Sequence, residues 1–361
     1  MKVILKIKFL LLISAFLFLS SKSYSQEDRG YKIYQFPANM IPRIDGNTED
    51  WDAFPAEYIV GTDQLWDDSK HYPKTDPSNL DVKVRVAWVK GLNRLYFLYE
   101  AYDDYWDFSL PDLHNDIFEI VVDGDLSGGP LTDQLHLNQD LSWRQRYFDF
   151  HGVHAQNYHI FTPAVGKDWA LAWGSQPWIK KMPYSNIAYS YNFKPGEPGK
   201  LIAEFWITLF DYAGESPERA VESNLYDNKK IGLTWAVIDY DDVNDEKKKG
   251  FWNLSKNHKM YGNSSLGTIF TLQPLDQKYQ KAFDAKWSFK VTNMNKRQVS
   301  FIDESTGKIT KWHWDFGDGT TSNEQNPIHE YKNAGKYIVI LDIEGPSGKA
   351  RMANVWDVAV Y

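Results

Sequence analysis

The feature that most constrains the fold of this chain is a series of short segments with the two-residue alternation of a β-strand. Residues 82–88 alternate apolar and polar side chains, and residues 94–102 follow them after a Gly91-Leu92-Asn93 turn, which predicts a hairpin. Residues 116–122 predict a third, more apolar strand, which ends at an acidic turn. Many short strands without a long helical period predict an all-β fold built of packed sandwiches.

Further strands are expected along the rest of the chain, near residues 147–150, 186–193, 201–209, 232–239 and 268–272. Short helical turns are expected near residues 211–214 and 276–283. The Pro- and Gly-rich segment 194–199 predicts a turn between two of the strands. A change of pattern near residues 274–286 predicts a boundary between a large domain at 30–275 and a small one at 284–361.

The first 25 residues have the pattern of a secretory signal peptide. Three lysines precede an apolar run at 9–19, and Ser23 and Ser25 place small side chains before Gln26. The run is too short for a stable membrane span, and no later stretch approaches that length. The chain has no cysteine, which excludes disulfides and a lipid anchor on cysteine. We therefore expect an extracellular or periplasmic protein.

Charge and aromatic content narrow the expected ligands. The formal net charge is −8, and it becomes about −12 without the four lysines of the leader, which argues against a nucleic-acid partner. The chain contains 15 Trp, 22 Tyr and 20 Phe. Many of these rings belong in the core, and a surplus at the surface is suited to stacking on the apolar faces of sugar rings.

The C-terminal region carries three connected motifs. They are Trp-His-Trp-Asp-Phe-Gly-Asp-Gly at 312–319, Asn-Pro-Ile-His-Glu-Tyr at 326–331, and the alternating segment 334–341. Gly317 and Gly319 supply the backbone freedom that the first turn needs. The series resembles a PKD domain, which implies a small immunoglobulin-like β-sandwich that spaces or supports other extracellular modules. The two tryptophans are expected to pack inside that sandwich.

The large domain carries four landmarks in order. An Ile-Asp-Gly at 44–46 is followed by Asp50-Trp51, and Asp116 to Glu119 begin an Asp-x-x-Glu-Ile strand. Later come Glu204 to Ile207 and an Ile-Gly at 231–232. This pattern resembles the carbohydrate-binding module family 9-like fold, which is related to DOMON domains, with a large insertion between residues 140 and 184. The resemblance implies a sugar-binding β-sandwich that often contains structural calcium.

The resemblance also implies the sugar-binding residues. Glu119 matches a strand carboxylate that points into the ligand site, and His136 takes the place of an arginine expected on the next strand. Two tryptophans clamp the sugar in the family. One position is occupied here by Leu113, with Trp106 as the nearest indole, and Trp252 is the counterpart of the other. A sugar site needs an aromatic platform beside hydrogen-bonding groups, and these four residues supply both types.

Two acidic clusters are candidate calcium sites, because hard oxygen donors at alternate positions suit calcium. One consists of Asp123 and Asp125, and the other contains Asp239, Asp241 and Asp242. For each cluster a solvated loop is the alternative. His151, His154 and His159 could form a transition-metal site, although the segments around them resemble strands rather than a helix. The insertion that carries these histidines is also rich in tryptophan, Trp143 among them, and is a candidate ligand loop.

These features favour a secreted, non-catalytic protein that binds a polysaccharide or oligosaccharide, with the PKD-like domain as spacer or docking module. The sequence lacks the common motifs of hydrolases, metalloproteases and nucleotide-binding enzymes. A glycoside-active hydrolase remains an alternative, because two carboxylates suffice for that chemistry. A surface adhesin or assembly protein that binds another protein is the third hypothesis.

Overall fold

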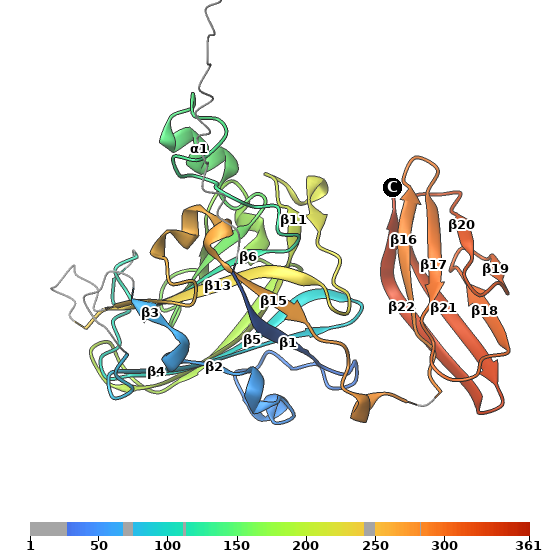
Figure 1. The fold of residues 1–361 in the computed structure, drawn as a ribbon, viewed down its shortest axis with the longest axis horizontal. Helices are drawn as coiled ribbons and strands as arrows, with labels where there is room; N and C mark the ends of the chain where they lie inside the picture. The colour runs from blue at the N-terminus through green and yellow to red at the C-terminus, as the bar shows by residue number, and fades with distance from the viewer. Residues whose placement is uncertain (1–26, 68–74, 111–112, 242–249, 282) are drawn as a thin grey trace, which may run out of the picture.

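The computed structural model describes residues 27–67, 75–110, 113–241, 250–281 and 283–361. The predicted signal peptide at 1–25 and Asp242 lie outside these ranges. Two β units follow one another, a large one that ends with β15 (Thr268–Leu272) and a small one that begins with β16 (Trp287–Asn293), as Figure 1 shows. Among the described residues the one α-helix is α1 (Trp143–Phe150), so the all-β prediction is confirmed.

One half of the large unit is a sheet in the order β8-β7-β6-β13-β15-β1, with β14 and β3 attached beside β13. Its strands are β1 (Glu27–Gln35), β3 (Trp66–Asp67), β6 (Ile117–Asp123), β7 (Gln156–Phe161), β8 (Ala170–Ala172), β13 (Lys230–Asp239), β14 (Gly250–Asn253) and β15. We call this half the α1 sheet, because α1 belongs to the segment between its strands β6 and β7.

The other half follows β1 in the order β4-β5-β10-β9, with β2 attached to β4. Its strands are β2 (Val60–Gly61), β4 (Leu80–Val89), β5 (Leu92–Asp103), β9 (Ser185–Tyr191) and β10 (Gly199–Thr208). Strand β1 belongs to both halves, because Ile33 pairs with Leu272 whereas the next residue, Tyr34, pairs with Ala87. The sheet therefore curls into a sandwich around β1.

Short elements complete the large unit. They are the two-stranded ribbon of β11 (Phe210–Tyr212) and β12 (Val221–Glu222), and the 3-10 helices η1 (Glu49–Trp51), η2 (Ala56–Tyr58), η3 (Thr62–Gln64), η4 (Pro177–Lys180), η5 (Pro217–Arg219), η6 (His258–Gly262), η7 (Ser264–Leu266) and η8 (Gln277–Tyr279). Of the helices that the structure describes, none has the length and apolar character needed to cross a membrane.

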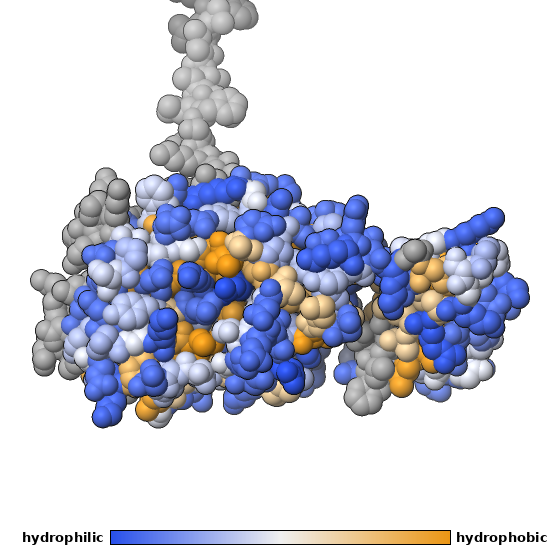
Figure 2. All heavy atoms as spheres, turned by 90° about the horizontal axis from the view of Figure 1, so that it is seen from below, coloured by the Kyte–Doolittle hydropathy of each residue, from blue (hydrophilic) through white to orange (hydrophobic). Residues whose placement is uncertain are grey.

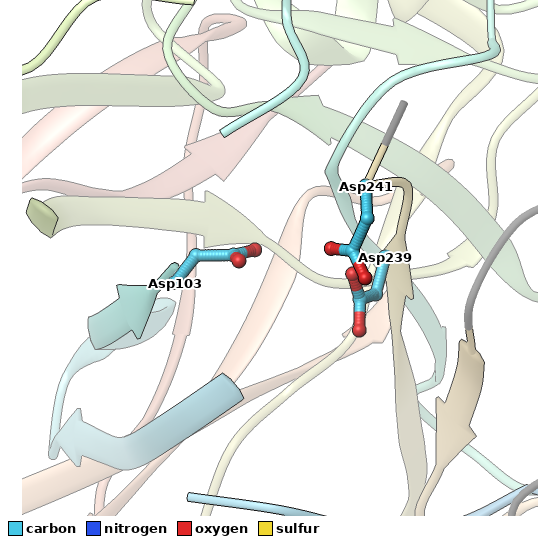
Figure 3. A group of neighbouring side chains, drawn as sticks. All are labelled: Asp103, Asp239 and Asp241. Atoms are coloured by element: carbon cyan, nitrogen blue, oxygen red, sulfur yellow. The ribbon is translucent and has the colours of Figure 1, made fainter. Parts of the chain in front are cut away.

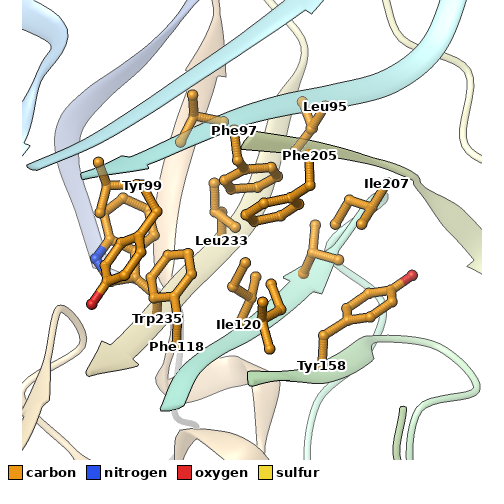
Figure 4. Close-up of a cluster of buried hydrophobic side chains, with 14 of the residues drawn as sticks. Leu95, Phe97, Tyr99, Phe118, Ile120, Tyr158, Phe205, Ile207, Leu233 and Trp235 are labelled. Atoms are coloured by element: carbon orange, nitrogen blue, oxygen red, sulfur yellow. The ribbon is translucent and has the colours of Figure 1, made fainter. Parts of the chain in front are cut away.

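Aromatic side chains fill the space between the two halves (Figure 4). Phe97 and Phe205 stack with their ring centroids 4.8 Å apart, and Tyr99 stacks at 4.4 Å on Phe118 of the opposite sheet. Each of these side chains is at most 1% exposed. Stacked rings add specific contacts to the burial of large apolar areas, so much of the high aromatic content serves the core.

Two of the expected local structures are wrong. Residues 147–150, predicted as a strand, form the second half of α1, and residues 210–212 form β11 where a helical turn was expected. The helix begins with a capping box, because Ser142 Oγ accepts from the Gln145 N–H while Gln145 Oε1 accepts from the Ser142 N–H. This reciprocal cap satisfies two backbone donors and favours the helix over a strand.

The Ile-Asp-Gly motif is held in place by a buried carboxylate. Glu204 of β10 is fully buried and accepts from the N–H groups of Asp45 and Gly46 at 3.0 and 3.1 Å, and from the Trp51 indole N–H at 2.9 Å. Gly46 has φ +80°, and a Cβ there would lie 3.1 Å from the backbone of Tyr189. The motif therefore fastens the segment that follows β1 to the outer face of the β4–β10 half.

That outer face has its own apolar cluster, in which Phe36, Trp51 and Phe54 pack against strand residues such as Leu98 and Trp206. In the view from below Figure 1, apolar residues gather in the middle of the large unit and hydrophilic residues surround them (Figure 2). The Glu204 hydrogen bonds keep this covering segment closed over the sheet.

The small unit consists of two facing sheets, in the orders β16-β17-β20 and β19-β18-β21-β22. Its further strands are β17 (Gln298–Asp303), β18 (Lys311–Asp315), β19 (Thr321–Ser322), β20 (Ile328–Glu330), β21 (Gly335–Gly345) and β22 (Gly348–Val360). Trp314 is fully buried and its indole donates to Glu324 O at 3.0 Å. The ring of His329 stacks on Phe316 at 4.1 Å, so the sequence motifs of this unit contact one another in its core.

Replacing Glu204 tests how much this buried carboxylate stabilises the fold. Glu204→Ala leaves two backbone N–H groups and one indole N–H without their acceptor, and each such loss costs about 1–3 kcal/mol. We expect the free energy of unfolding to fall by roughly 3 kcal/mol or more, measured by urea unfolding. Glu49→Ala, an exposed acid in the same segment, is the control. Equal stability of the two variants would contradict the role of Glu204.

Candidate functional site

Three carboxylates meet at one end of the large sandwich. Asp103 is the last residue of β5, Asp239 is the last residue of β13, and Asp241 lies two positions later. One oxygen atom from each lies within 4.8 Å of the others, and Figure 3 shows Asp103 pointing toward the other two. Because β5 and β13 belong to opposite halves, this Asp triad bridges the two sheets.

Burial and mutual repulsion disfavour ionisation of the Asp triad. Burial, followed by the charge of Asp239, raises the pKa of Asp103 to about 9. Burial, followed by the charge of Asp241, raises the pKa of Asp239 to about 8. The pKa of the neighbouring Asp116 is also raised, first by burial and then by the charges of Asp103 and Asp239. A bound cation would reverse this cost by stabilising the charged carboxylates.

The geometry of the Asp triad fits a metal ion. Asp103 and Asp239 are only 1% and 2% exposed, and Oδ2 of the former and Oδ1 of the latter accept no hydrogen bond within the described chain. Burying a carboxylate oxygen without a hydrogen-bond donor costs free energy, unless a bound cation replaces the missing donor. The triad can therefore hold a metal ion. The sequence identified Asp239 and Asp241 but missed Asp103, because its proximity arises only when the two sheets pack.

The other predicted calcium cluster organises a turn. Asp123 accepts from the N–H groups of Ser127 and Gly128 and from Ser264 Oγ, whereas the exposed Asp125 accepts from the N–H and hydroxyl of Ser127. Burial raises the pKa of Asp123 to about 6. The buried ammonium of Lys229 interacts electrostatically with both acids. Local donors and a lysine therefore hold both acids at this turn, and the calcium site expected here stays a prediction.

Glu119 lies on the outer face of the α1 sheet in a buried polar cluster. Its Oε1 accepts from Asn157 Nδ2 at 3.0 Å and lies 3.5 Å from His159 Nε2. His159 is paired directly opposite Glu119 on β7, and its Nδ1 accepts from the Trp173 indole at 2.7 Å. Burial lowers the pKa of His159 to about 3, so its imidazole is neutral. The tautomer with hydrogen on Nε2 fits both neighbours.

His136 does not occupy the position that was predicted for it. The neighbours of β6 are β7 and β13, and the residues in register with Glu119 are His159 and Ala236. The ring of His136 is 7% exposed and packs against Phe150 of α1 at 4.6 Å, while its Nδ1 accepts from the Asn138 N–H. Burial and then the charge of Arg146 lower the pKa of His136. It supports the segment that leads into α1.

Trp106 and Trp252 are also placed differently from the expected open platforms. Trp106 is 1% exposed, stacks on Phe193 at 4.7 Å and donates from its indole to Gly199 O. Trp252 is 5% exposed, lies in the core between the halves, and hydrogen-bonds to Asp239 of the Asp triad. With both rings covered, neither can stack on a sugar in this conformation, so the clamp predicted from the resemblance requires correction.

The histidines considered for a transition metal do not converge. His151 is 1% exposed and stacks in parallel with Trp173, His159 belongs to the Glu119 cluster, and the ring of His154 packs edge-on against Tyr212. Among the residues that the structure describes, the Asp triad is the one group of three acids or histidines with metal-binding proximity.

A groove of about 570 Å³ lies beside α1, over the α1 sheet. Its aromatic residues are Trp143 from the first turn of α1, 57% exposed, and Tyr261 from η6, 41% exposed. One face of Trp143 stacks on Tyr147 at 4.9 Å, which fixes the orientation of the indole. We call this cavity the α1 groove. Its polar lining includes Asp133, Gln134, Gln139, Arg146, Asn257, Lys259 and Asn263.

The polar side chains of the α1 groove are held by one another and by the backbone. Arg146 Nη1 donates to Gln139 Oε1 at 3.2 Å, and Asn263 Nδ2 donates to Asp133 Oδ2 at 3.1 Å. Asn257 Oδ1 accepts from the Lys259 N–H and caps η6. The groove thus combines exposed aromatic rings with oriented amide and charged groups. Of its residues, only Trp143 stood out in the sequence, as a member of the insertion.

The chain resembles a solved structure in fold, at low sequence identity. A carbohydrate binding module family 9 from Caldicellulosiruptor kristjanssonii, in complex with cellotriose, aligns over 70% of this chain and 97% of that chain. The TM-score is 0.44 and the sequence identity is 13%.

Sequence relatives match only short stretches. Collagenase ColQ1 of Bacillus cereus (strain Q1) is 48% identical over 46 residues, which are 13% of this chain and 5% of the relative. A microbial collagenase of Vibrio alginolyticus is 42% identical over 60 residues, 16% of this chain and 7% of the relative. The matched stretches therefore span a small fraction of these relatives.

The C-terminal unit has more specific matches. The PKD1 domain of the Vibrio cholerae metalloprotease PrtV is 30% identical and aligns over 20% of this chain and 91% of that chain, with a TM-score of 0.19. Residues 283–360 match the family model described as PKD domain. The C-terminal unit of this chain is therefore a PKD domain, as its motifs predicted.

Proposed function

We propose that this protein is a non-catalytic carbohydrate-binding protein and that its ligand lies in the α1 groove. The observation that carries the proposal is the presence, in one groove, of two exposed aromatic rings beside fixed polar side chains. Trp143 and Tyr261 offer flat apolar faces for the C–H surface of a sugar ring. Gln139, Asn257 and Asp133 offer the donors and acceptors that hydroxyl groups require.

The buried Glu119 cluster has a supporting role in this proposal. Tyr147 of α1 packs edge-on against Trp173 at 5.3 Å, and Trp173 donates to His159 of the cluster. Because Tyr147 also stacks on Trp143, the cluster and the exposed indole are joined through one chain of contacts. The resemblance of the sequence motifs to sugar-binding modules is consistent with a ligand on this side of the sandwich, although with different aromatic residues.

The Asp triad supplies structural rigidity in the same proposal, with calcium as its ion. Three carboxylates form an all-oxygen donor set, which hard cations such as calcium prefer. An ion at this position would connect β5 and β13, the two strands that carry Asp103 and Asp239 from opposite halves. The remaining coordination positions would be filled by backbone carbonyls or water, as is usual for calcium.

The leader at 1–25 places the protein outside the cytoplasm in this proposal, in the extracellular space or the periplasm. The PKD domain then serves as a spacer or docking module for the large unit. Lys90 at the end of the β4–β5 hairpin is a contact between the units, because its Nζ lies 2.6 Å from Glu304 Oε2 and 3.1 Å from Asp227 Oδ2.

Removal of the groove aromatics tests the binding proposal. We expect Trp143→Ala and Tyr261→Ala each to weaken retention on a polysaccharide affinity gel, by up to about tenfold for a stacking contact. Trp66→Ala is the matched control, since Trp66 is 48% exposed but lies outside the groove.

Three results would contradict this proposal. If the intact protein binds no polysaccharide, the carbohydrate-binding proposal is wrong. If the protein cleaves a glycan and one carboxylate substitution abolishes the cleavage, the protein is a hydrolase. A tight protein partner that is retained by the Trp143 and Tyr261 variants would instead favour an adhesin.

Chelation tests the calcium proposal. Calcium at about 100 times its dissociation constant stabilises a protein that binds it only when folded by about 2.7 kcal/mol. We therefore expect EDTA to lower the thermal midpoint and added calcium to restore it. Asp103→Asn and Asp239→Asn are expected to abolish this response, because each removes a charged ligand of the triad.

Asp125→Asn is the matched control for the triad variants, because this acid is exposed and belongs to the other acidic cluster. Its response to calcium should equal that of the unchanged protein. If Asp125→Asn abolishes the calcium response and Asp103→Asn keeps it, the ion binds at the Asp123–Asp125 turn and not at the Asp triad.

A further inference from the structure

Arg146 is the unusual residue of the α1 groove. It is the fourth residue of the groove-lining helix α1, and only 8% of its surface is exposed. Among the described residues it forms no ion pair with a carboxylate, and its Nε is buried without a hydrogen-bond partner. Charged side chains are almost never buried to this degree unless they are paired. The position of Arg146 therefore requires an explanation.

The protein contacts of Arg146 occupy one side of the guanidinium. Nη1 donates to Gln139 Oε1 at 3.2 Å and to Leu141 O at 3.3 Å, so this nitrogen is satisfied by neutral acceptors. These contacts hold the guanidinium plane in a fixed orientation at the wall of the groove. Since Nε is buried and Nη1 is engaged, Nη2 is the nitrogen that is left to donate a charge-assisted hydrogen bond to an anionic group in the groove.

The residues that line the α1 groove carry one more positive charge than negative charge. The exposed Lys259 adds a second positive charge to the lining. Asp133 is the acid of the lining, and its oxygens are engaged elsewhere, since Oδ1 accepts from the Leu135 N–H and Oδ2 accepts from Asn263 Nδ2. An anionic ligand would balance the positive charge that Asp133 leaves over.

We propose that the α1 groove binds an acidic glycan, with the carboxylate or sulfate group of the sugar on Arg146 and its ring on Trp143 and Tyr261. This inference rests on the proposed carbohydrate-binding function and names the ligand class of the same site. A carboxylate and a sulfate both offer charged oxygens that accept a strong hydrogen bond from a guanidinium N–H. Lys259 strengthens the attraction as a point charge at the rim of the groove.

The test compares three polymers that share related sugar rings and differ in charge. The intact protein is run through affinity gels that contain polygalacturonate, a sulfated galactan or neutral galactan. We expect at least one charged polymer to bind roughly tenfold more tightly than neutral galactan, as charge-assisted hydrogen bonds allow. The polygalacturonate and sulfated arms distinguish a carboxylate from a sulfate ligand.

Substitutions separate the role of Arg146 from general charge attraction. Arg146→Gln is expected to weaken binding of the charged polymer by roughly tenfold. Lys259→Gln is expected to weaken it by about threefold, as is typical of an exposed charge. Lys200→Gln, which removes an exposed charge outside the groove, should leave binding unchanged. If Arg146→Gln does not fold, the Lys259→Gln variant decides.

The outcomes distinguish this inference from the function on which it rests. The acidic ligand would be wrong, and sugar binding still right, if neutral and charged galactan retain the protein equally. In that case Trp143→Ala would lose retention, whereas Arg146→Gln and Lys259→Gln would keep it. Absence of retention on all glycans would overturn both. Loss of charged-polymer binding in Arg146→Gln, with unchanged thermal stability, would support the acidic ligand.

Discussion

The crowding of Asp103, Asp239 and Asp241 is the constraint on which the large sandwich depends. Three carboxylates within 4.8 Å of one another repel when ionised, and they sit where the two halves of the curled sheet come together. Without a cation these groups must keep protons to remain buried, which is why the pKa of Asp103 rises to about 9. A metal ion would turn this repulsion into a link between the sheets, and Trp252 hydrogen-bonds to Asp239 from within the core.

Helix α1 both covers a buried polar cluster and lines the α1 groove. Its inner side chains cover the Glu119 cluster, where Tyr147 meets Trp173 and His136 supports Phe150. Its first residue, Trp143, is exposed at the groove, and Arg146, three residues later, also lines the groove. Glu119 is therefore not available as a direct ligand in this conformation. The same short helix closes one polar site and forms the wall of another.

The sequence predicted the framework better than the sites. Period-two alternation located the principal strands, and the Trp-His-Trp-Asp-Phe-Gly-Asp-Gly motif identified the PKD domain, because both signals are local. Helix α1 was missed although Ser142 and Gln145 have capping-box spacing, a signal that the aromatic content around Tyr147 obscured. Asp103 could not be found from local pattern, since it joins Asp239 only after two sheets pack. The pairing of His159 with Glu119 likewise depends on which strand lies beside β6.

The distribution of aromatic residues explains why the composition suggested a sugar ligand but could not locate the aromatic residues that would contact it. Trp106, Trp252 and Trp314 are at most 5% exposed and find acceptors for their indole N–H groups inside the protein. A buried indole with a satisfied N–H contributes to packing and leaves no face for a ligand. Trp143 is different, because it is 57% exposed, stacks on Tyr147 and lines the α1 groove. The proposed binding surface therefore rests on an exposed tryptophan that a second ring supports, rather than on an indole near a strand motif.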